Sequence, residues 1–210
     1  MTIKQTKIGL SFWLKWVLAT TVGFYLCVIV SRVVSHNMGE MIGSKLDNSF
    51  IFPFIPLLAG FFFAICAGVG VGIMQWLILR RRVSRVGWWA PSIVAGMVLT
   101  SVLLLGLSIA RKYFLDSENF FALDMIILLS LGGTLTGVFQ WFFLRRQISR
   151  AGWWLLASAV GWSLGAVVWF SSWFRFLGIL NAMGLFFVII MGAVTGGALV
   201  WLLRQPVNIK

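Results

Sequence analysis

Charged side chains are scarce in this chain, and acidic ones are the scarcest: only 5 of its 210 residues are Asp or Glu. Charged residues make up 10% of the sequence and hydrophobic residues 60%. Since a soluble domain of this length cannot bury so much apolar surface, the composition excludes the soluble classes. No carboxylate lies in the middle of an apolar run. This argues against an ion-coupled pump, because such pumps place ionisable groups inside the membrane.

Histidine and cysteine are rarer still, with one His and two Cys in the chain. His36 falls in a predicted outer connection, Ser35–Ser49, whereas Cys27 and Cys66 fall well inside apolar runs. A buried cysteine usually serves as a small apolar residue, and no further ligand cluster accompanies these two. Ser-His-Asp, Cys-His, His-x-x-x-His and phosphate-loop patterns are also missing. We therefore expect no catalytic residue, no metal site and no cofactor, and a protein that is not an enzyme.

Long apolar runs, in contrast, fill most of the chain. A run of about 20 apolar residues can cross a hydrocarbon layer of ~30 Å as a helix. Six such runs are present, at residues 10–33, 52–79, 88–110, 122–144, 152–174 and 178–203. The sequence therefore predicts an all-α integral membrane protein with six transmembrane helices in a single domain, 1–210.

The net charge of +12 comes mainly from basic residues beside these runs. Basic connections stay on the cytoplasmic side of a membrane, so their distribution predicts that both termini are cytoplasmic. Because this role accounts for the charge, we expect no nucleic-acid partner. The expected contact is the lipid bilayer, with anionic headgroups near the basic side chains. The connections after the second and fourth runs hold Arg80, Arg81, Arg82, Arg85, Arg145, Arg146 and Arg150.

One segment occurs twice at an offset of 65 residues. Gly68–Trp89 reads GVGVGIMQWLILRRRVSRVGWW, and Gly133–Trp154 reads GTLTGVFQWFFLRRQISRAGWW. A weaker third copy of its beginning is Gly192-Ala-Val-Thr-Gly196 in the last run. A repeat of this size indicates that the spans were built by duplication of one unit.

The first, third and fifth runs also align with one another, through Trp16, Trp89 and Trp154. The six spans then pair as three helical hairpins. Because each hairpin starts on the inner side, the repeats are parallel and related by an axis along the membrane normal. The predicted hairpins cover approximately residues 8–81, 86–146 and 151–205.

Glycines recur four positions apart in these spans, a spacing that lets helix backbones approach closely in lipid. We interpret them first as helix-packing contacts within the chain. Contact between copies in a homo-oligomer and a substrate path lined by backbone are the alternatives. The glycine pairs are Gly68 and Gly72, Gly133 and Gly137, Gly161 and Gly165, and Gly192 and Gly196.

Gln75 and Gln140 are the most prominent polar residues inside the spans, and each is followed by tryptophan, Trp76 or Trp141. A glutamine amide in hydrocarbon needs hydrogen-bond partners. Our first interpretation is an interhelical hydrogen bond, worth about 0.6 kcal/mol on average. A ligand or pigment contact beside the tryptophans, or an amide that reaches toward the headgroups, is the alternative.

Tryptophans gather toward the inner side, as in the aromatic belts of membrane proteins. Arg80 and Arg145 follow Trp76 and Trp141 by four residues, so a cation–π contact on one helix face is feasible. We expect these arginines and their neighbours to contact anionic headgroups. The belt is predicted to contain Trp13, Trp16, Trp76, Trp88, Trp89, Trp141, Trp153, Trp154 and Trp201.

The repeated Gln-Trp-x-x-Leu-Arg-Arg and Gly-Trp-Trp motifs resemble those of a group of small, uncharacterised multi-pass membrane proteins frequent in cyanobacteria. The similarity covers most of the chain, although the first hairpin and the last span lack the motif or keep only a remnant. It implies a multi-pass protein of the plasma membrane or thylakoid of a photosynthetic bacterium. It carries over no catalytic residue.

Two functions are compatible with these features. The first is a non-enzymatic membrane protein that packs with, stabilises or helps assemble a larger membrane complex. The second is a small-solute transporter or channel with a path between the hairpins, for which the polar residues must converge on a cavity. A membrane enzyme with a lipid substrate is the weakest hypothesis, because His, Asp and Glu do not cluster. The residues expected along a path are Gln75, Gln140, Thr134, Thr136 and Thr195.

Overall fold

The structure is a computed structural model of the chain, and it describes residues 9–43, 55–83, 86–110, 121–170 and 180–205. Every regular element in these ranges is helical. The elements are α1 (Leu10–Gly43), α2 (Ile55–Leu79), the 3-10 helix η2 (Val86–Trp88), α3 (Trp89–Ala110), α4 (Phe121–Leu144), α5 (Trp153–Phe170) and α7 (Leu180–Leu203).

Six of the described helices are long and apolar enough to cross a membrane, with mean hydropathy between 1.5 and 2.3 over their spanning segments. This confirms the predicted all-α class and its six apolar spans. Helices form here because hydrocarbon offers no hydrogen-bond partner, so the backbone of each span must satisfy its own N–H and C=O groups. Residues 171–174, predicted as the end of the fifth span, lie outside the described part of the chain.

The outer connection predicted from Ser35 is wrong in its first part, because α1 continues as a helix to Gly43. The apolar span of this helix ends at Val34, so its last turns extend beyond the apolar part. No proline interrupts the extension, and glycine is the residue at which helices commonly end. His36 is therefore exposed on a helix and does not lie in a loop. The rest of that connection lies outside the described residues. The other two outer connections are predicted at Arg111–Asn119 and Ser171–Asn181, and they lie outside the described residues too, except that Leu180 and Asn181 already belong to α7.

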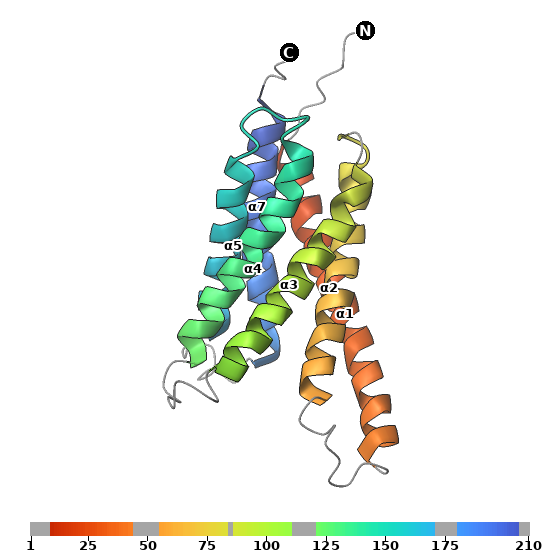
Figure 1. The fold of residues 1–210 in the computed structure, drawn as a ribbon. Coiled ribbons are helices and arrows are strands. Elements are labelled where there is room, and N and C mark those ends of the chain that lie inside the picture. Colours follow the sequence, from red (N-terminus) through yellow and green to blue (C-terminus); the bar gives the residue numbers. More distant parts are fainter. Residues whose placement is uncertain (1–8, 44–54, 84–85, 111–120, 171–179, 206–210) are drawn as a thin grey trace.

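The helices form a closed ring, in which each packs against its neighbours in sequence and α7 packs against α1. Successive helices run in opposite directions, so α1 begins and α7 ends at the same end of the bundle (Figure 1). The ends of α2 and α4, which lead into Arg80 and Arg145, lie there too. We call this the arginine end. Because the ring is closed, its six helices surround one central axis.

Two turns at the arginine end close in the same way. After α2, the N–H groups of Arg82 and Val83 donate to the carbonyl of Leu79, at 2.8 and 2.9 Å. The two backbone N–H groups 65 residues later donate in the same way to the carbonyl of Leu144, at 2.9 and 2.8 Å. Arg150 then takes a left-handed conformation with φ of 60°, which redirects the chain toward α5. The two copies of the repeated segment thus begin their connections with one local geometry.

Candidate functional site

Three tryptophans meet where the helices surround the axis, near the arginine end. Trp16 of α1, Trp89 of α3 and Trp154 of α5 are at most 2% exposed. Their ring centres lie 5.6 to 6.2 Å apart, and Trp16 contacts each of the other two edge-on. We call these three residues the tryptophan triad. Edge-to-face contacts of this kind stabilise aromatic clusters beyond the burial of their area.

The triad corrects part of the predicted aromatic belt. In each repeated Trp-Trp pair one ring is exposed and the other is buried: Trp88 and Trp153 are 65% and 55% exposed, whereas Trp89 and Trp154 are buried. Successive residues of a helix point about 100° apart, so the two rings of each pair face different directions, and here one of them faces the neighbouring helices. This periodicity, applied to the repeated pair, was the sequence signal that could have identified the buried rings.

Each indole N–H of the triad donates to a side chain of the preceding helix around the ring. Trp89 Nε1 donates to Gln75 Oε1 at 3.0 Å, and Trp154 Nε1 donates to Gln140 Oε1 at 2.9 Å. Trp16 Nε1 donates to Thr195 Oγ1 at 3.1 Å, since Leu199 occupies the aligned glutamine position of α7. The structure therefore places both glutamines, 5% and 3% exposed, in hydrogen bonds between helices.

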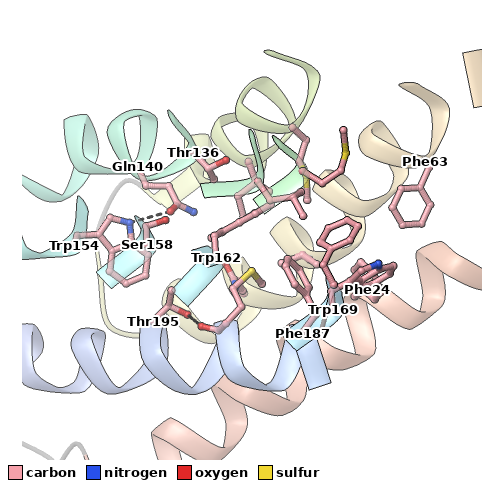
Figure 2. A pocket seen from close by; sticks show the side chains of 18 residues that line it. Phe24, Phe63, Thr136, Gln140, Trp154, Ser158, Trp162, Trp169, Phe187 and Thr195 are labelled. Carbon is pink, nitrogen blue, oxygen red and sulfur yellow. Dashed lines mark hydrogen bonds between the residues drawn. The ribbon is translucent and has the colours of Figure 1, made fainter. Parts of the chain in front are cut away.

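The amide nitrogens of the two glutamines have different surroundings. Gln75 Nε2 donates to Thr20 Oγ1 at 2.9 Å, so both ends of that amide are bonded. The position that aligns with Thr20 in α3 is Ile93, which has no hydroxyl. Among the described residues, no group accepts a hydrogen bond from Gln140 Nε2, and this nitrogen points away from Trp154 (Figure 2). The Trp154 donor fixes which end of the Gln140 amide is oxygen, so the nitrogen must face the other way.

Thr136, one turn before Gln140, also has an unused hydrogen-bonding group. It is 4% exposed, and its Oγ1 has no hydrogen-bond partner among the described residues. Other hydroxyls in the helices bond to the carbonyl four residues earlier, as Thr134 does to Ser130 at 2.9 Å and Thr195 to Met191 at 2.7 Å. A buried polar group without a partner costs about 1–3 kcal/mol.

Thr136 and Gln140 are among the residues that line a cavity of about 280 Å³ on the axis of the ring, although Thr136 Oγ1 itself packs against Gly96 of α3. Side chains from all six helices line it, and Figure 2 shows them around the open space. One part of the wall is polar and near the tryptophan triad, and the rest is aromatic or aliphatic. None of the described residues that line the cavity carries a charge. Its polar residues are Gln75, Gln140, Thr136, Ser158 and Thr195.

The apolar wall is built mainly from aromatic rings. Trp162 and Trp169 of α5 both contact Phe187 of α7 edge-on, with ring centres 5.7 and 5.8 Å apart. Next to them, Phe24 of α1 and Phe63 of α2 are in edge contact, with ring centres 5.9 Å apart. The sequence analysis missed these five residues, because an aromatic residue on an apolar helix has the same sequence pattern whether it faces lipid or the axis.

Most of the predicted packing glycines lie where two helices touch. A Cβ added at Gly72 would lie 2.7 Å from Cα of Ala90 in α3, and one at Gly137 would lie 2.8 Å from Cβ of Ser158 in α5. Gly161 has more room, with its nearest atom at 3.4 Å. A contact that the sequence did not reveal joins Gly23 of α1 to Gly70 of α2, where an added Cβ would lie 2.6 Å from the facing carbonyl oxygen. The other predicted glycines, which also contact a neighbouring helix, are Gly68, Gly133, Gly165, Gly192 and Gly196.

The arginines that follow α2 and α4 lie at the arginine end, and none of those that the structure describes lines the cavity. The guanidinium carbon of Arg80 is 5.0 Å from the ring centre of Trp76, and that of Arg145 is 4.9 Å from Trp141. Both distances are within the range of cation–π contacts. Arg80, Arg81, Arg145, Arg146 and Arg150 are exposed, as anchors at a lipid surface must be, whereas Arg85 lies outside the described residues.

Comparisons with known proteins give no relative for this arrangement: no family model, curated protein or solved structure matches the chain. Within the described ranges, no three His, Cys, Asp or Glu side chains come together as a group that could hold a metal ion. The candidate site is therefore defined by its own geometry. It is an apolar cavity, bounded near the arginine end by the tryptophan triad, with polar groups on its wall.

Proposed function

We propose that this chain is a non-enzymatic integral membrane protein of a bacterial plasma membrane or thylakoid, and that it packs with, stabilises or helps assemble a larger membrane complex. In this proposal the six helices are three parallel hairpins with both termini in the cytoplasm. The arginine end then faces anionic headgroups of the inner leaflet. The support comes from the small residues on the helix surfaces, and from which of them already contact another helix of the chain.

The observation that carries the proposal is a groove on the outside of the ring between α5 and α7. It encloses about 470 Å³ between side chains of the two helices. Small residues, Ala157, Gly197 and Ala198, are among those that line it, and Trp153 and Trp201 meet at 6.0 Å between ring centres. Small residues let another helix backbone approach closely, so the groove suits a transmembrane helix of a partner protein.

The glycine pairs predicted from the sequence are already occupied by the chain's own helices. Gly72 contacts α3, Gly137 contacts α5, and Gly196 contacts Trp16 of α1. These faces are therefore closed to a partner helix. The α5/α7 groove combines small residues with exposure to the surroundings of the bundle, which is why we place the partner contact there.

The test is co-purification with a matched pair of variants. Wild-type protein extracted in a gentle detergent should migrate on native gels in a larger complex, with a second membrane protein identified by mass spectrometry. Ala198→Phe fills the groove and should release the partner while the monomer stays folded. Ala95→Phe adds the same bulk at an exposed position of α3 and should keep the complex. Wild-type protein that migrates alone, or only with copies of itself, would contradict the proposal.

A second candidate, a small-solute transporter or channel, is favoured by one specific observation. Four of the five residues expected along a path line the same cavity, namely Gln75, Gln140, Thr136 and Thr195. Thr134 does not line it and bonds to its own helix instead. Solute uptake into proteoliposomes should then fall in Gln140→Leu. If neither this variant nor Gln75→Leu changes the uptake of any candidate solute, the transporter function is left without support.

A further inference from the structure

The cavity has one pair of hydrogen-bonding groups that the protein itself does not use. Thr136 and Gln140 are four residues apart on α4, so their side chains lie on the same helix face, one turn apart. The hydroxyl of Thr136 and the amide nitrogen of Gln140 both lack partners among the described residues. In the first copy of the repeated segment the aligned residues are Val71 and Gln75, and Gln75 is bonded at both ends. The unused pair is therefore a property of one copy only.

The chemistry of the pair selects a hydrogen-bond acceptor. Gln140 Nε2 can only donate. The Thr136 hydroxyl packs against Gly96 of α3 in the structure, and it reaches the cavity through the second χ1 rotamer that threonine adopts in helices, from which it can donate as well. A carbonyl or ether oxygen placed between them would satisfy both groups. A carboxylate is excluded by the wall, because none of the described lining residues carries a charge that could compensate it.

The rest of the cavity requires an apolar body. Its volume of about 280 Å³ is close to the lower limit of pockets that hold small ligands. A single water molecule occupies only ~30 Å³ in the liquid, so water at the polar groups would leave most of the apolar space unfilled. Trp162, Trp169 and Phe187 line that space with aromatic rings, against which a flat ring packs well.

We propose that the cavity binds a neutral, ring-bearing apolar molecule with one acceptor oxygen, which Gln140 Nε2 and Thr136 Oγ1 hold near the tryptophan triad. The ring body extends toward Trp169 and the C-terminal end of α5. The site goes beyond the assembly function proposed above and does not depend on a partner protein.

A pair of probe molecules tests the proposal directly. The full-length protein in nanodiscs is titrated with 2-acetylnaphthalene, a neutral aromatic ketone, and with 2-ethylnaphthalene, which has the same shape without the oxygen. The readout is the saturable rise in unfolding temperature with probe concentration. Wild-type protein should bind the ketone more tightly than the hydrocarbon, on the order of tenfold, as expected for one or two neutral hydrogen bonds.

Variants of α4 locate the preference in the cavity. Thr136→Val and Gln140→Leu should each bring the ratio between ketone and hydrocarbon close to one. Thr134→Val, which removes a hydroxyl outside the cavity, should keep the wild-type ratio. Valine has nearly the shape of threonine, so Thr136→Val remains informative even where Gln140→Leu fails to fold.

Two results would overturn the proposal. One is equal affinity of the wild type for both probes, or only a linear effect of each as it dissolves in the bilayer. The other is an unchanged ketone preference in Thr136→Val. Neither result affects co-migration with a partner protein, so failure of this proposal is distinguishable from failure of the assembly function.

Discussion

Gln75 and Gln140 occupy the same position in two copies of one sequence segment, and their environments differ at one end only. Each accepts a hydrogen bond from a buried tryptophan of the following helix. The amide nitrogen of Gln75 is bonded to Thr20, whereas Ile93 stands at the aligned position beside Gln140. The amide oxygen, which is bonded in both copies, joins neighbouring helices. The amide nitrogen, whose surroundings differ, is left as a free donor in the cavity at Gln140. A duplicated motif can therefore supply structure in both copies and a binding group in one.

The largest expected effects test the packing that both copies share. Gly72→Ala and Gly137→Ala should each lower the free energy of unfolding by about 2 kcal/mol, because the added methyl meets atoms of the next helix at less than 3 Å. Equilibrium unfolding in mild detergent measures this. In Gly161→Ala the methyl makes ordinary contacts, and the higher helix propensity of alanine should leave stability unchanged or raise it by up to ~1 kcal/mol. A large loss for Gly72→Ala alone would show that the two copies do not pack alike.

The next largest effect should come from Gln75→Leu. This variant leaves the indole N–H of Trp89 without an acceptor and removes the bond to Thr20. We expect a loss of about 2 kcal/mol in the free energy of unfolding, at the upper end for hydrogen bonds inside a membrane protein. Val71, one turn earlier, has no oxygen with which to replace the lost acceptor.

Gln140→Leu should cost less, about 1 kcal/mol. Here Thr136 lies one turn earlier. Thr195 occupies the aligned position of α7, one turn before Leu199, and it accepts the indole N–H of Trp16. The free hydroxyl of Thr136 can accept the indole N–H of Trp154 in the same way. The double variant Gln140→Leu with Thr136→Val should then lose more than the sum of the single variants. Additive losses would show that Thr136 offers no such replacement.

The smallest effect should come from Thr136→Val without any ligand, and its sign is informative. Replacing an unpartnered buried hydroxyl by a methyl group should leave stability unchanged or raise it by about 1 kcal/mol. Thr195→Val is the matched comparison, and it should destabilise the protein because it removes the acceptor for Trp16. Thermal unfolding of both variants in the same detergent measures the contrast. Destabilisation by Thr136→Val would mean that the hydroxyl already has a partner.

The sequence predicted the helices well because the apolar runs are long and the bilayer permits few backbone structures. It failed at residues 35–43, where a polar composition with two glycines was interpreted as a loop; the segment holds no proline, and the helix passes Gly39 and ends only at Gly43. The contact between Gly23 and Gly70 also escaped, since neither residue belongs to a predicted glycine pair.

Four polar residues that line the cavity were named from the sequence, namely Gln75, Gln140, Thr136 and Thr195, whereas Ser158 and the cavity itself were not. Gln75 and Gln140 were identified because an amide is conspicuous in an apolar span. The free end of Gln140 could not be predicted, because it depends on what a different helix places opposite it, Thr20 in one case and Ile93 in the other. The cavity itself arises from the spacing of six helices around an axis, which no local pattern records.

The proposed function rests on three helical hairpins that share one orientation in the membrane. Single cysteines at positions 83 and 148, in a background without Cys27 and Cys66, test it most directly when labelled with a membrane-impermeant thiol reagent in intact cells and in inverted vesicles. We expect both cysteines to react from the cytoplasmic side only. Reaction of the two from opposite sides of the membrane would contradict it.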